Sequence, residues 1–412
     1  MSSGLAAWAA AVGLTAAWTW VAAAPEPITQ IAGGSAIRLG QSAPLTGPTA
    51  PLGVGVRVGV QAAVAEINRT GGVRGRPVEL ISLDDGYEPK RTGANMRTLL
   101  DTEGVLAVIG SVGAPCAVTA VPIAQEKQTL LYGYVTGGAV LRKSPPDRYV
   151  VNYRASLAEE VGLLVDHFVS QGIATNEIAF FTQQDVFGEA AYTGGVAALS
   201  RHGLKSPGAV RHVRYERNTS NIEGGLSELL LMDPQPRAVV FGGAADPLIA
   251  FVRESRKADF LPIVGTVSFV DATRVAEQLG PMGEGLVISQ VVPPLCSGVP
   301  VVDRYREALK SVDPQARPGY GSLEGYISAR ALLESLRTIE GEITREATVE
   351  AIRSVAGMDL GLGDGRRLRM RPDGHTIGGY LWLTQIRSSE VVMVQSHRTA
   401  GVGDQPEVTA GK

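Results

Sequence analysis

The feature that most constrains the fold is a regular alternation of short apolar strands and amphipathic helices between residues 37 and 110. The pattern predicts strands at Ile37–Gln41, Val78–Asp84 and Val105–Ile109, separated by helices at 55–69 and 90–102. Strands that alternate with helices form a parallel sheet whose faces are covered by those helices. Because ligands bind such sheets beyond the carboxyl ends of the strands, the loop at residues 42–54 is a candidate binding loop.

The same alternation continues along the rest of the chain. Further strands are expected at 129–134, 177–182, 210–215, 238–241, 263–266 and 286–290. Further helices are expected at 117–126, 157–171, 187–202, 222–232, 247–258, 301–312, 320–339 and 345–354. The extended segment Tyr149–Arg154 and the pair Pro293-Pro294 predict two crossings between separate groups of elements. Terminal strands at 380–386 and 391–394 predict a third crossing, so the pattern indicates two lobes.

The composition is that of a soluble globular protein with room for two cores. The chain has 412 residues, of which 44% are hydrophobic and 19% charged, and a chain of this length exceeds the usual size of one domain. The formal net charge is −3, and no cluster of Lys or Arg stands out. We therefore expect no nucleic-acid partner.

The N-terminus differs from the rest of the chain. Residues 5–24 carry no charged side chain and end in VAAAP, which is typical of a signal peptide with an apolar region and a small-residue cleavage site. We expect a signal peptide at 1–24 and a leader at 25–36. A stretch of this length could also remain as a membrane anchor, although no Leu/Ile/Val run supports that alternative. Residues 398–412 lack an apolar pattern and are expected to be disordered.

Neither a catalytic nor a metal site is predicted. The five histidines are scattered, at 167, 202, 212, 375 and 397, without the spacing of a metal motif. Asp84 and Asp85 are adjacent on a strand, so their side chains point to opposite faces and do not form an acid–base pair. Asp85 is expected to order the following loop. The chain contains no phosphate-binding glycine motif, so no cofactor is expected and an enzyme is disfavoured.

Several motifs follow one another in a fixed order. They are PLTG (44–47), EINRTGGVRGRPV (66–78), DDGYEP (84–89), VIGSVGAPCAVTAVPIA (108–124), FFTQQDVFGEAA (180–191) and GEGLVISQVVPP (283–294). This ordered set resembles the type I periplasmic solute-binding proteins, and within them the Leu/Ile/Val branch of ABC importers. The resemblance covers roughly residues 37–394.

The resemblance implies an α/β fold of two lobes, each a parallel sheet flanked by helices. Lobe 1 would comprise 37–150 and 293–376, and lobe 2 would comprise 151–292 and 377–397. It also implies a periplasmic monomer that binds a small molecule between its lobes and delivers it to an ABC permease and ATPase. The alternative is a ligand-sensing receptor module with the same fold, of the kind that responds to amides or amino acids.

Lobe 1 is expected to contribute three loops to the ligand site. Leu52 lies in the first loop, where relatives use an aromatic residue. The second contains Ala114, Pro115 and Cys116 at a helix start, where free N–H groups attract a carboxylate. Relatives have Ser or Thr there to bind the ligand carboxylate. In this chain the hydroxyl is missing, so backbone N–H groups must bind the carboxylate to a greater extent. The third loop supplies Tyr134, Thr136 and Gly138, with Thr136 as the best hydroxyl candidate.

Lobe 2 is expected to contribute Asp185, Phe187, Ala244, Val267 and Ser268. Phe187 corresponds to an aromatic residue that covers the ligand in relatives, whereas Ala244 lies where relatives often have Tyr. Amino-acid binders place a Glu in the loop at 266–271 to pair the ligand ammonium, and the aligned Val267 and Ser268 are not acidic.

An ammonium buried without a carboxylate is unfavourable. Asp246 could reach inward as a substitute for the missing Glu. Otherwise the cleft, lined by Leu52, Phe187 and Phe269, favours an apolar or aromatic carboxylate, an amide or another neutral metabolite over branched-chain amino acids.

The two cysteines are expected to be free thiols. Some relatives carry a disulfide near the binding loop, but Tyr87 and Gly113 occupy the corresponding positions here. Cys116 is expected to start a helix in lobe 1 and Cys296 to lie near a crossing. An exported protein could pair its cysteines, but a bond at these positions would restrain closure of the lobes.

Overall fold

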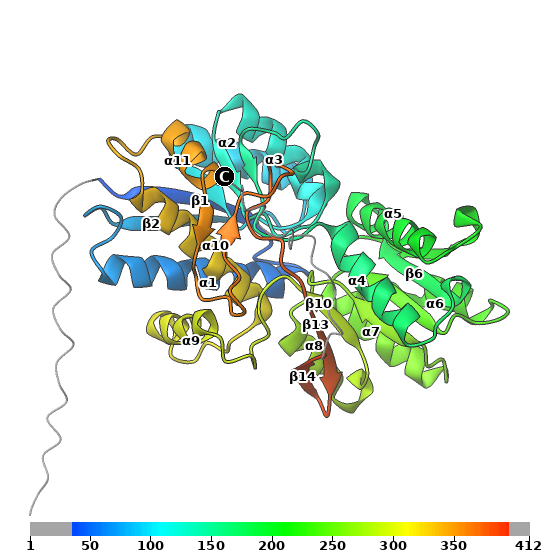
Figure 1. Cartoon of the computed structure of the whole chain (residues 1–412). Helices are drawn as coiled ribbons and strands as arrows, with labels where there is room; N and C mark the ends of the chain where they lie inside the picture. The colour runs from blue at the N-terminus through cyan, green and yellow to red at the C-terminus, as the bar shows by residue number, and fades with distance from the viewer. Residues whose placement is uncertain (1–34, 395–412) are drawn as a thin grey trace, which may run out of the picture.

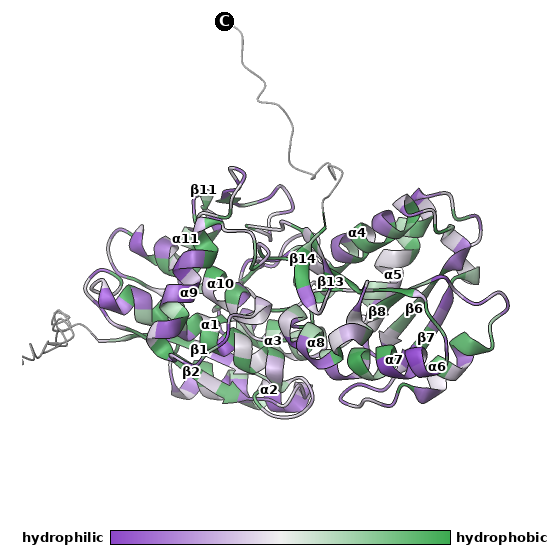
Figure 2. Cartoon of the chain, turned by 90° about the horizontal axis from the view of Figure 1, so that it is seen from below, coloured by the Kyte–Doolittle hydropathy of each residue, from purple (hydrophilic) through white to green (hydrophobic). Residues whose placement is uncertain are grey.

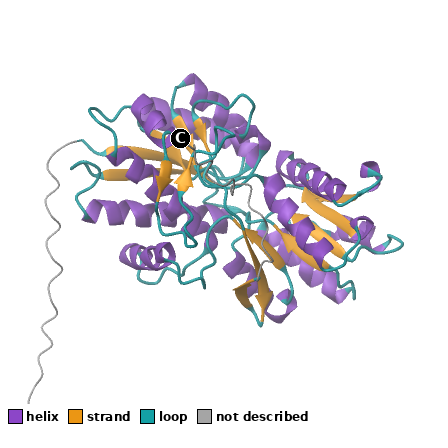
Figure 3. Cartoon of the chain, viewed as in Figure 1, coloured by secondary structure: helices purple, strands orange, loops and turns teal. Residues whose placement is uncertain are grey.

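The computed structural model describes residues 35–394 as two α/β lobes side by side (Figure 1). The predicted signal peptide, the predicted leader up to residue 34 and the predicted tail lie outside the described residues. Figure 3 shows that each lobe has a central group of strands with helices packed around it. This arrangement confirms the predicted fold class.

The lobe 1 sheet is parallel throughout. Its strands are ordered β2-β1-β3-β4-β5, and they are β1 (Ile37–Ala43), β2 (Val78–Asp84), β3 (Ala107–Ile109), β4 (Leu130–Tyr132) and β5 (Val150–Val151). The helices of this lobe are α1 (Ala50–Arg69), α2 (Pro89–Arg97), α3 (Ala114–Glu126), α9 (Pro300–Val312), α10 (Tyr320–Arg337) and α11 (Arg345–Arg353). A π-helical turn at Thr98–Thr102 extends α2.

The lobe 2 sheet is mixed, with the strand order β14-β13-β10-β9-β8-β6-β7. Its parallel strands are β6 (Ile178–Gln183), β7 (Arg211–Tyr215), β8 (Ala238–Gly242), β9 (Ile263–Thr266) and β10 (Val287–Gln290). The terminal strand β13 (Trp382–Arg387) pairs antiparallel with β10, and β14 (Glu390–Met393) pairs antiparallel with β13. The helices are α4 (Leu157–Ser170), α5 (Val186–Arg201), α6 (Glu223–Leu230), α7 (Ala245–Lys257) and α8 (Ala272–Leu279).

The chain passes between the two sheets three times. It leaves β5 for α4, leaves β10 for α9, and reaches β13 after the small antiparallel pair β11 (Ala356–Met358) and β12 (Leu368–Arg369). Because all three segments lie close together, they form one hinge between the lobes. The lobe boundaries given above remain a proposal.

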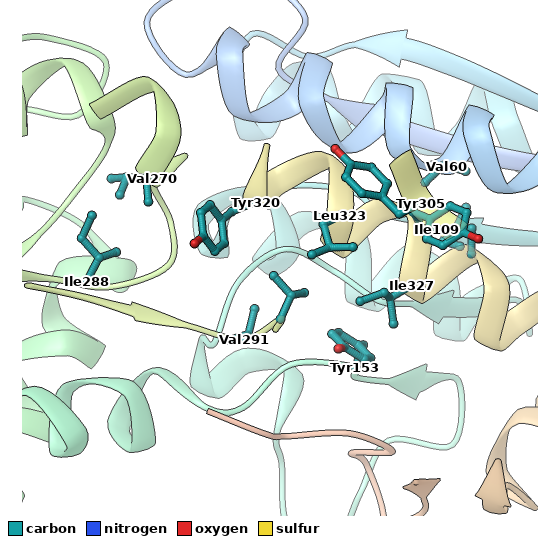
Figure 4. Packing of buried hydrophobic residues seen from close by; sticks show 14 of the residues in the cluster. Val60, Ile109, Tyr153, Val270, Ile288, Val291, Tyr305, Tyr320, Leu323 and Ile327 are labelled. Atoms are coloured by element: carbon teal, nitrogen blue, oxygen red, sulfur yellow. The ribbon is translucent and has the colours of Figure 1, made fainter. Parts of the chain in front are cut away.

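A continuous apolar core runs through the hinge. Figure 4 shows Val270 and Ile288 of lobe 2 on one side of Tyr320, and Leu323 and Ile327 of α10 on the other; all five are buried in one cluster. Figure 2 shows hydrophilic residues along the outer faces of helices such as α7. The lobes therefore share packed apolar surface at the hinge, while their outer faces are polar.

Helix α1 is apolar because it packs closely on α10. A Cβ at Gly59 would lie 1.8 Å from the Ser322 carbonyl oxygen, and a Cβ at Gly325 would lie 2.3 Å from that of Val56. Only glycine permits this approach of two backbones. In the described residues, α1 is the one helix long and apolar enough to cross a membrane, and its buried face is used in this packing.

Several predicted boundaries were wrong. Helix α1 begins at Ala50 rather than residue 55, because Pro51 is compatible with a first helical turn. Strand β4 ends at Tyr132, where Gly133 turns the backbone with a φ of 58°. Helix α8 was not predicted, although Asp271 caps it through the N–H groups of Thr273 and Arg274.

Candidate functional site

Two loops of lobe 1 meet beyond the carboxyl ends of β3 and β4. A Cβ at Gly138 would lie 2.9 Å from the Ala114 Cβ, so the third predicted loop packs on the start of α3. The Gly138 N–H donates to Thr136 Oγ1 at 3.2 Å, which shows that this hydroxyl orders its own turn. Pro115, in the first turn of α3, is buried and has no N–H to donate.

Tyr87 closes one side of these loops. A Cβ at Gly113 would lie 2.0 Å from Tyr87 Cε2, so Tyr87 and Gly113, the two positions discussed above in place of a cysteine pair, are in contact. Gly113 has a φ of 94° and Tyr87 a φ of 64°. Asp85 holds the strained Tyr87 by accepting its N–H at 2.9 Å, and strain of this kind persists only where the surroundings fix it.

Two side chains on the lobe 1 side of the cleft, Cys116 and Tyr134, are uncharged. Burial, with a further contribution from the Asp85 carboxylate, raises the pKa of Cys116 to about 12, so the residue is a neutral thiol rather than a nucleophile. Burial also raises the pKa of Tyr134 well above its ordinary value. The Tyr134 hydroxyl is buried without a hydrogen-bond partner among the residues that the structure describes.

An aromatic cluster, formed by Tyr87, Phe187 and Phe269, joins the two lobes. The ring centroids of Phe187 and Phe269 are 4.7 Å apart, and those of Tyr87 and Phe269 are 5.8 Å apart. Gln183 of lobe 2 donates to the Tyr87 hydroxyl at 3.2 Å. All three rings are at most 1% exposed, so the cluster forms a dry contact between the lobes.

Asp185 positions Phe187 rather than offering a free carboxylate. It caps α5 by accepting the N–H groups of Phe187 at 2.9 Å and Gly188 at 3.2 Å. A cap of this kind fixes the first helical turn. The predicted aromatic residue is therefore presented to lobe 1 from a rigid helix start.

Leu52 and Ala244 face each other across a small interlobe cavity, whose lining also includes Phe269, Asp271 and Arg274. Its volume of about 10 Å³ is about the size needed for one water molecule. Leu52 is only 6% exposed, because α1 begins earlier than predicted and carries Leu52 in its first turn. A more open depression of about 340 Å³ lies near the amino ends of β6 and β7, away from this cleft.

The remaining lobe 2 residues have other partners. The Ser268 N–H donates to Glu160 Oε2 at 2.8 Å, and the neighbouring Val267 is fully buried. Asp246 pairs with Arg274 at 2.7 Å, and Arg274 lines the small interlobe cavity. Asp271 links the lobes, because it accepts the Gly321 N–H at 3.2 Å while it caps α8.

A polar latch crosses the mouth of the cleft. We use this name for Arg217 and Asn218 of lobe 2 with Gly86, Tyr87 and Glu88 of lobe 1. Arg217 Nη2 lies 3.1 Å from Glu88 Oε2, and Arg217 Nη1 donates to the Tyr87 carbonyl. Asn218 Nδ2 donates to Glu88 Oε1 at 2.6 Å. These contacts hold the lobes in a closed arrangement.

Asp84 and Asp85 serve the loops around the site. Asp85 Oδ2 accepts from Ser42 at 2.8 Å and Thr92 at 3.0 Å. Asp84 accepts the Leu45 N–H at 2.8 Å and pairs with Arg91. Among residues 35–394, no group of three His, Cys, Asp or Glu side chains is arranged to hold a metal.

The structure places the predicted residues in three groups. Those near the aromatic cluster are Ala114, Pro115, Cys116, Tyr134, Thr136, Gly138, Asp185 and Phe187, whereas Leu52 and Ala244 line the small cavity and Val267 and Ser268 lie near Glu160. Sequence reasoning missed the latch and Glu160. The latch could have been found, because Arg217 and Asn218 also follow the carboxyl end of a predicted strand. Both cysteines are free, Cys116 buried and Cys296 exposed, as predicted.

Residues 36–390 match the model of a family described as periplasmic binding protein. A solved structure, a possible leucine/isoleucine/valine-binding protein from Rhodopirellula baltica, is 40% identical, with a TM-score of 0.84 over 87% of this chain and 96% of that one. A Leu/Ile/Val-binding protein homolog of Brucella melitensis is 27% identical over 50% of this chain and 61% of its own length. A solute binding protein from R. palustris in complex with benzoate is 16% identical, with a TM-score of 0.76 over 87% and 95% of the two chains.

Proposed function

The chain belongs to the type I periplasmic binding proteins of the branched-chain amino-acid family, and from this premise we propose that it is the solute receptor of an ABC importer. Proteins of this family are exported, and they bind small molecules for transport systems rather than acting as enzymes. We propose that the protein binds a small amino-acid-like, apolar or aromatic carboxylate between its lobes and delivers it to a cognate permease and ATPase.

The observation that carries this proposal is the aromatic cluster between the lobes. Tyr87 comes from lobe 1, Phe187 and Phe269 come from lobe 2, and the rings are buried against one another. A ligand that enters between these rings would gain apolar contact with both lobes and thereby favour closure. The N–H groups at the start of α3 support a carboxylate on the same ligand.

The fold alone does not determine the ligand. The most identical structure reported above is a possible leucine/isoleucine/valine-binding protein, whereas a structure with the same fold holds benzoate. Benzoate and the branched-chain amino acids each combine a carboxylate with an apolar group, which is the combination that we propose for the cleft.

Native mass spectrometry of the mature protein would identify a co-purified ligand. Isothermal titration with L-leucine, 4-methylpentanoate and benzoate would then measure affinity for each class. We expect binding of one small carboxylate per chain without chemical change. Turnover of that ligand by the purified protein, or binding only to ligands without a carboxylate, would contradict the proposal. Uptake assays in cells that lack the protein would test delivery to the permease.

A further inference from the structure

One carboxylate caps a helix in each lobe. Asp271 precedes α8 in lobe 2, and its Oδ1 accepts the N–H groups of Thr273 at 3.0 Å and Arg274 at 3.2 Å. Its Oδ2 accepts the N–H group of Gly321, in the first turn of α10 in lobe 1, at 3.2 Å. We call Asp271 with these three donors the interlobe cap. The two carboxylate oxygens are therefore divided between helices of opposite lobes.

Helix α10 has no side-chain cap from its own N-cap position. That position is Gly319, and a Cβ there would lie 2.5 Å from Asp271 Oδ2. The φ of Gly319 is −142°, a value that any residue can adopt, so the backbone does not require glycine at this point. What requires it is the close approach of the carboxylate. A negative charge at the start of a helix is favourable, and here the other lobe supplies it.

Peptide N–H groups hold the charge of Asp271. The residue is partly buried, and burial raises the pKa of its carboxyl. A carboxylate removed from water needs donors that replace its hydration. Arg274 is the nearest cation in the sequence, but its guanidinium pairs with Asp246 at 2.7 Å. The donors in the interlobe cap are therefore two N–H groups of lobe 2 and one of lobe 1.

The interlobe cap lies beside candidate ligand residues. Asp271 lines the small interlobe cavity together with Leu52 and Phe269. A Cβ at Gly321 would lie 3.0 Å from Leu52 Cδ1 and 3.9 Å from Asp271 Oδ2, so three helix starts meet at this point. Phe269 precedes Asp271 by two residues and belongs to the aromatic cluster. A ligand that contacts Leu52 or Phe269 therefore lies next to the bond that joins α8 to α10.

We propose that Asp271 is a positioning residue that retains the ligand, because its bond to Gly321 forms when the lobes close and breaks when they open. This inference rests on the proposed function and goes beyond it. Asp271 acts without touching the ligand, since it holds the loop that carries Phe269 against the start of α10. A contact that exists only in the closed form slows dissociation of the ligand and leaves its association unchanged.

Two substitutions, one in each lobe, test the interlobe cap. In Asp271→Asn the amide oxygen can still cap α8, but the amide nitrogen cannot accept the Gly321 N–H group. In Gly319→Ala the added methyl group meets Asp271 Oδ2 only when the lobes are closed. Each variant should raise the dissociation rate constant about 5- to 50-fold, the order expected for losing a hydrogen bond to a charged group. Stopped-flow mixing with L-leucine, 4-methylpentanoate and benzoate measures both rate constants.

Matched controls make the same chemical changes away from the cleft. Asp313→Asn alters a carboxylate that accepts the Gln315 N–H group within lobe 1. Gly224→Ala adds a methyl group to α6, where no atom of another residue lies within 4 Å of the new Cβ. Both controls should leave the two rate constants unchanged.

An unchanged dissociation rate constant in either folded variant, or an equal increase in the controls, overturns the role of Asp271 and leaves the receptor function intact. If Asp271→Asn does not fold, as judged by circular dichroism, Gly319→Ala decides, because the backbone at this position accepts alanine. If the wild type binds none of the three carboxylates, the proposed ligand class is overturned, and scattering of the ligand-free proteins decides the role of Asp271. Both variants should then have a larger radius of gyration than the wild type, and equal radii would overturn the proposal.

Discussion

At the scale of single residues, Phe187 tests the aromatic cluster. Its ring is fully buried and lies 4.7 Å from that of Phe269. Phe187→Ala should weaken ligand binding by roughly 1–3 kcal/mol, the effect of losing a buried aromatic contact, as measured by isothermal titration. Phe180→Ala is the control, because Phe180 packs on Tyr192 inside lobe 2. It should lower the melting temperature and leave the affinity of the folded protein unchanged, and an equal loss of affinity in both variants would contradict the assignment.

His212 makes stability depend on pH. Burial, with a smaller contribution from Arg214, lowers its pKa from 6.5 to about 4. Between these values the unfolded chain binds a proton that the native protein does not, so the free energy of unfolding decreases as the pH falls from 6.5 to 4. His212→Phe keeps a ring against Tyr192 and should show a smaller decrease. Urea unfolding across this pH range measures the difference, and parallel curves for the two proteins would exclude this role.

The two cysteines should differ in reactivity. Cys296 is exposed, whereas Cys116 is buried and has a pKa raised to about 12 by that burial. A thiol reagent should therefore label one equivalent rapidly in the native protein and two in denatured, unreduced protein. The absence of reactive thiols after denaturation would show a disulfide between Cys116 and Cys296.

Individual site residues could be predicted only where they closely follow the end of a predicted strand. Phe187 and Ala114 follow strand ends, and the structure places Phe187 at the interlobe contact and Ala114 against Gly138. Glu160 follows the capping box formed by Ser156 and Glu159, so in the sequence it has the appearance of a solvated helix charge. Its burial depends on Ser268 and Ser289, which are more than a hundred residues away in the chain. No local pattern encodes such a contact.

At the scale of elements, the order of strands and helices could be predicted well and their ends less well. Strands β2 and β9 match their predicted ranges, because each follows a proline and contains β-branched residues. Helix α8 was missed, although it has eight residues like α6, which was predicted. Its existence depends on Asp271, whose carboxylate also accepts the Gly321 N–H of the other lobe.

The latch should stabilise the closed form. Arg217→Met and Glu88→Gln each remove the ion pair, and each should weaken ligand binding by about two- to fivefold, the range for a partly exposed pair. The double variant should be no weaker than either single one. Arg214 and Glu189 form a similar pair within lobe 2, so Arg214→Met and Glu189→Gln should leave affinity unchanged. If the losses of affinity in the two single variants add up in the double variant, Arg217 and Glu88 do not act together.

At the scale of the whole molecule, the structure implies that the lobes separate to admit a ligand. The interlobe cavity has a volume of about 10 Å³, which is far less than ligand pockets of about 300–1,000 Å³. The aromatic cluster and the latch also cross the entrance. A ligand can therefore enter only if these contacts break, and the crossings near Arg154, Val291 and Ile377 provide the hinge for that motion.

Small-angle scattering should detect this motion. Protein freed of ligand by unfolding and refolding should have a larger radius of gyration than the closed structure. Addition of the ligand identified by titration should restore the compact value, because ligand contacts with both lobes offset the opening. The Glu88→Gln and Arg217→Met variants should need more ligand to reach the same compact value, whereas the Arg214→Met control should not. A radius of gyration that stays compact without ligand and is unchanged by it would mean that the lobes do not open, and the binding site would then have to lie outside the cleft.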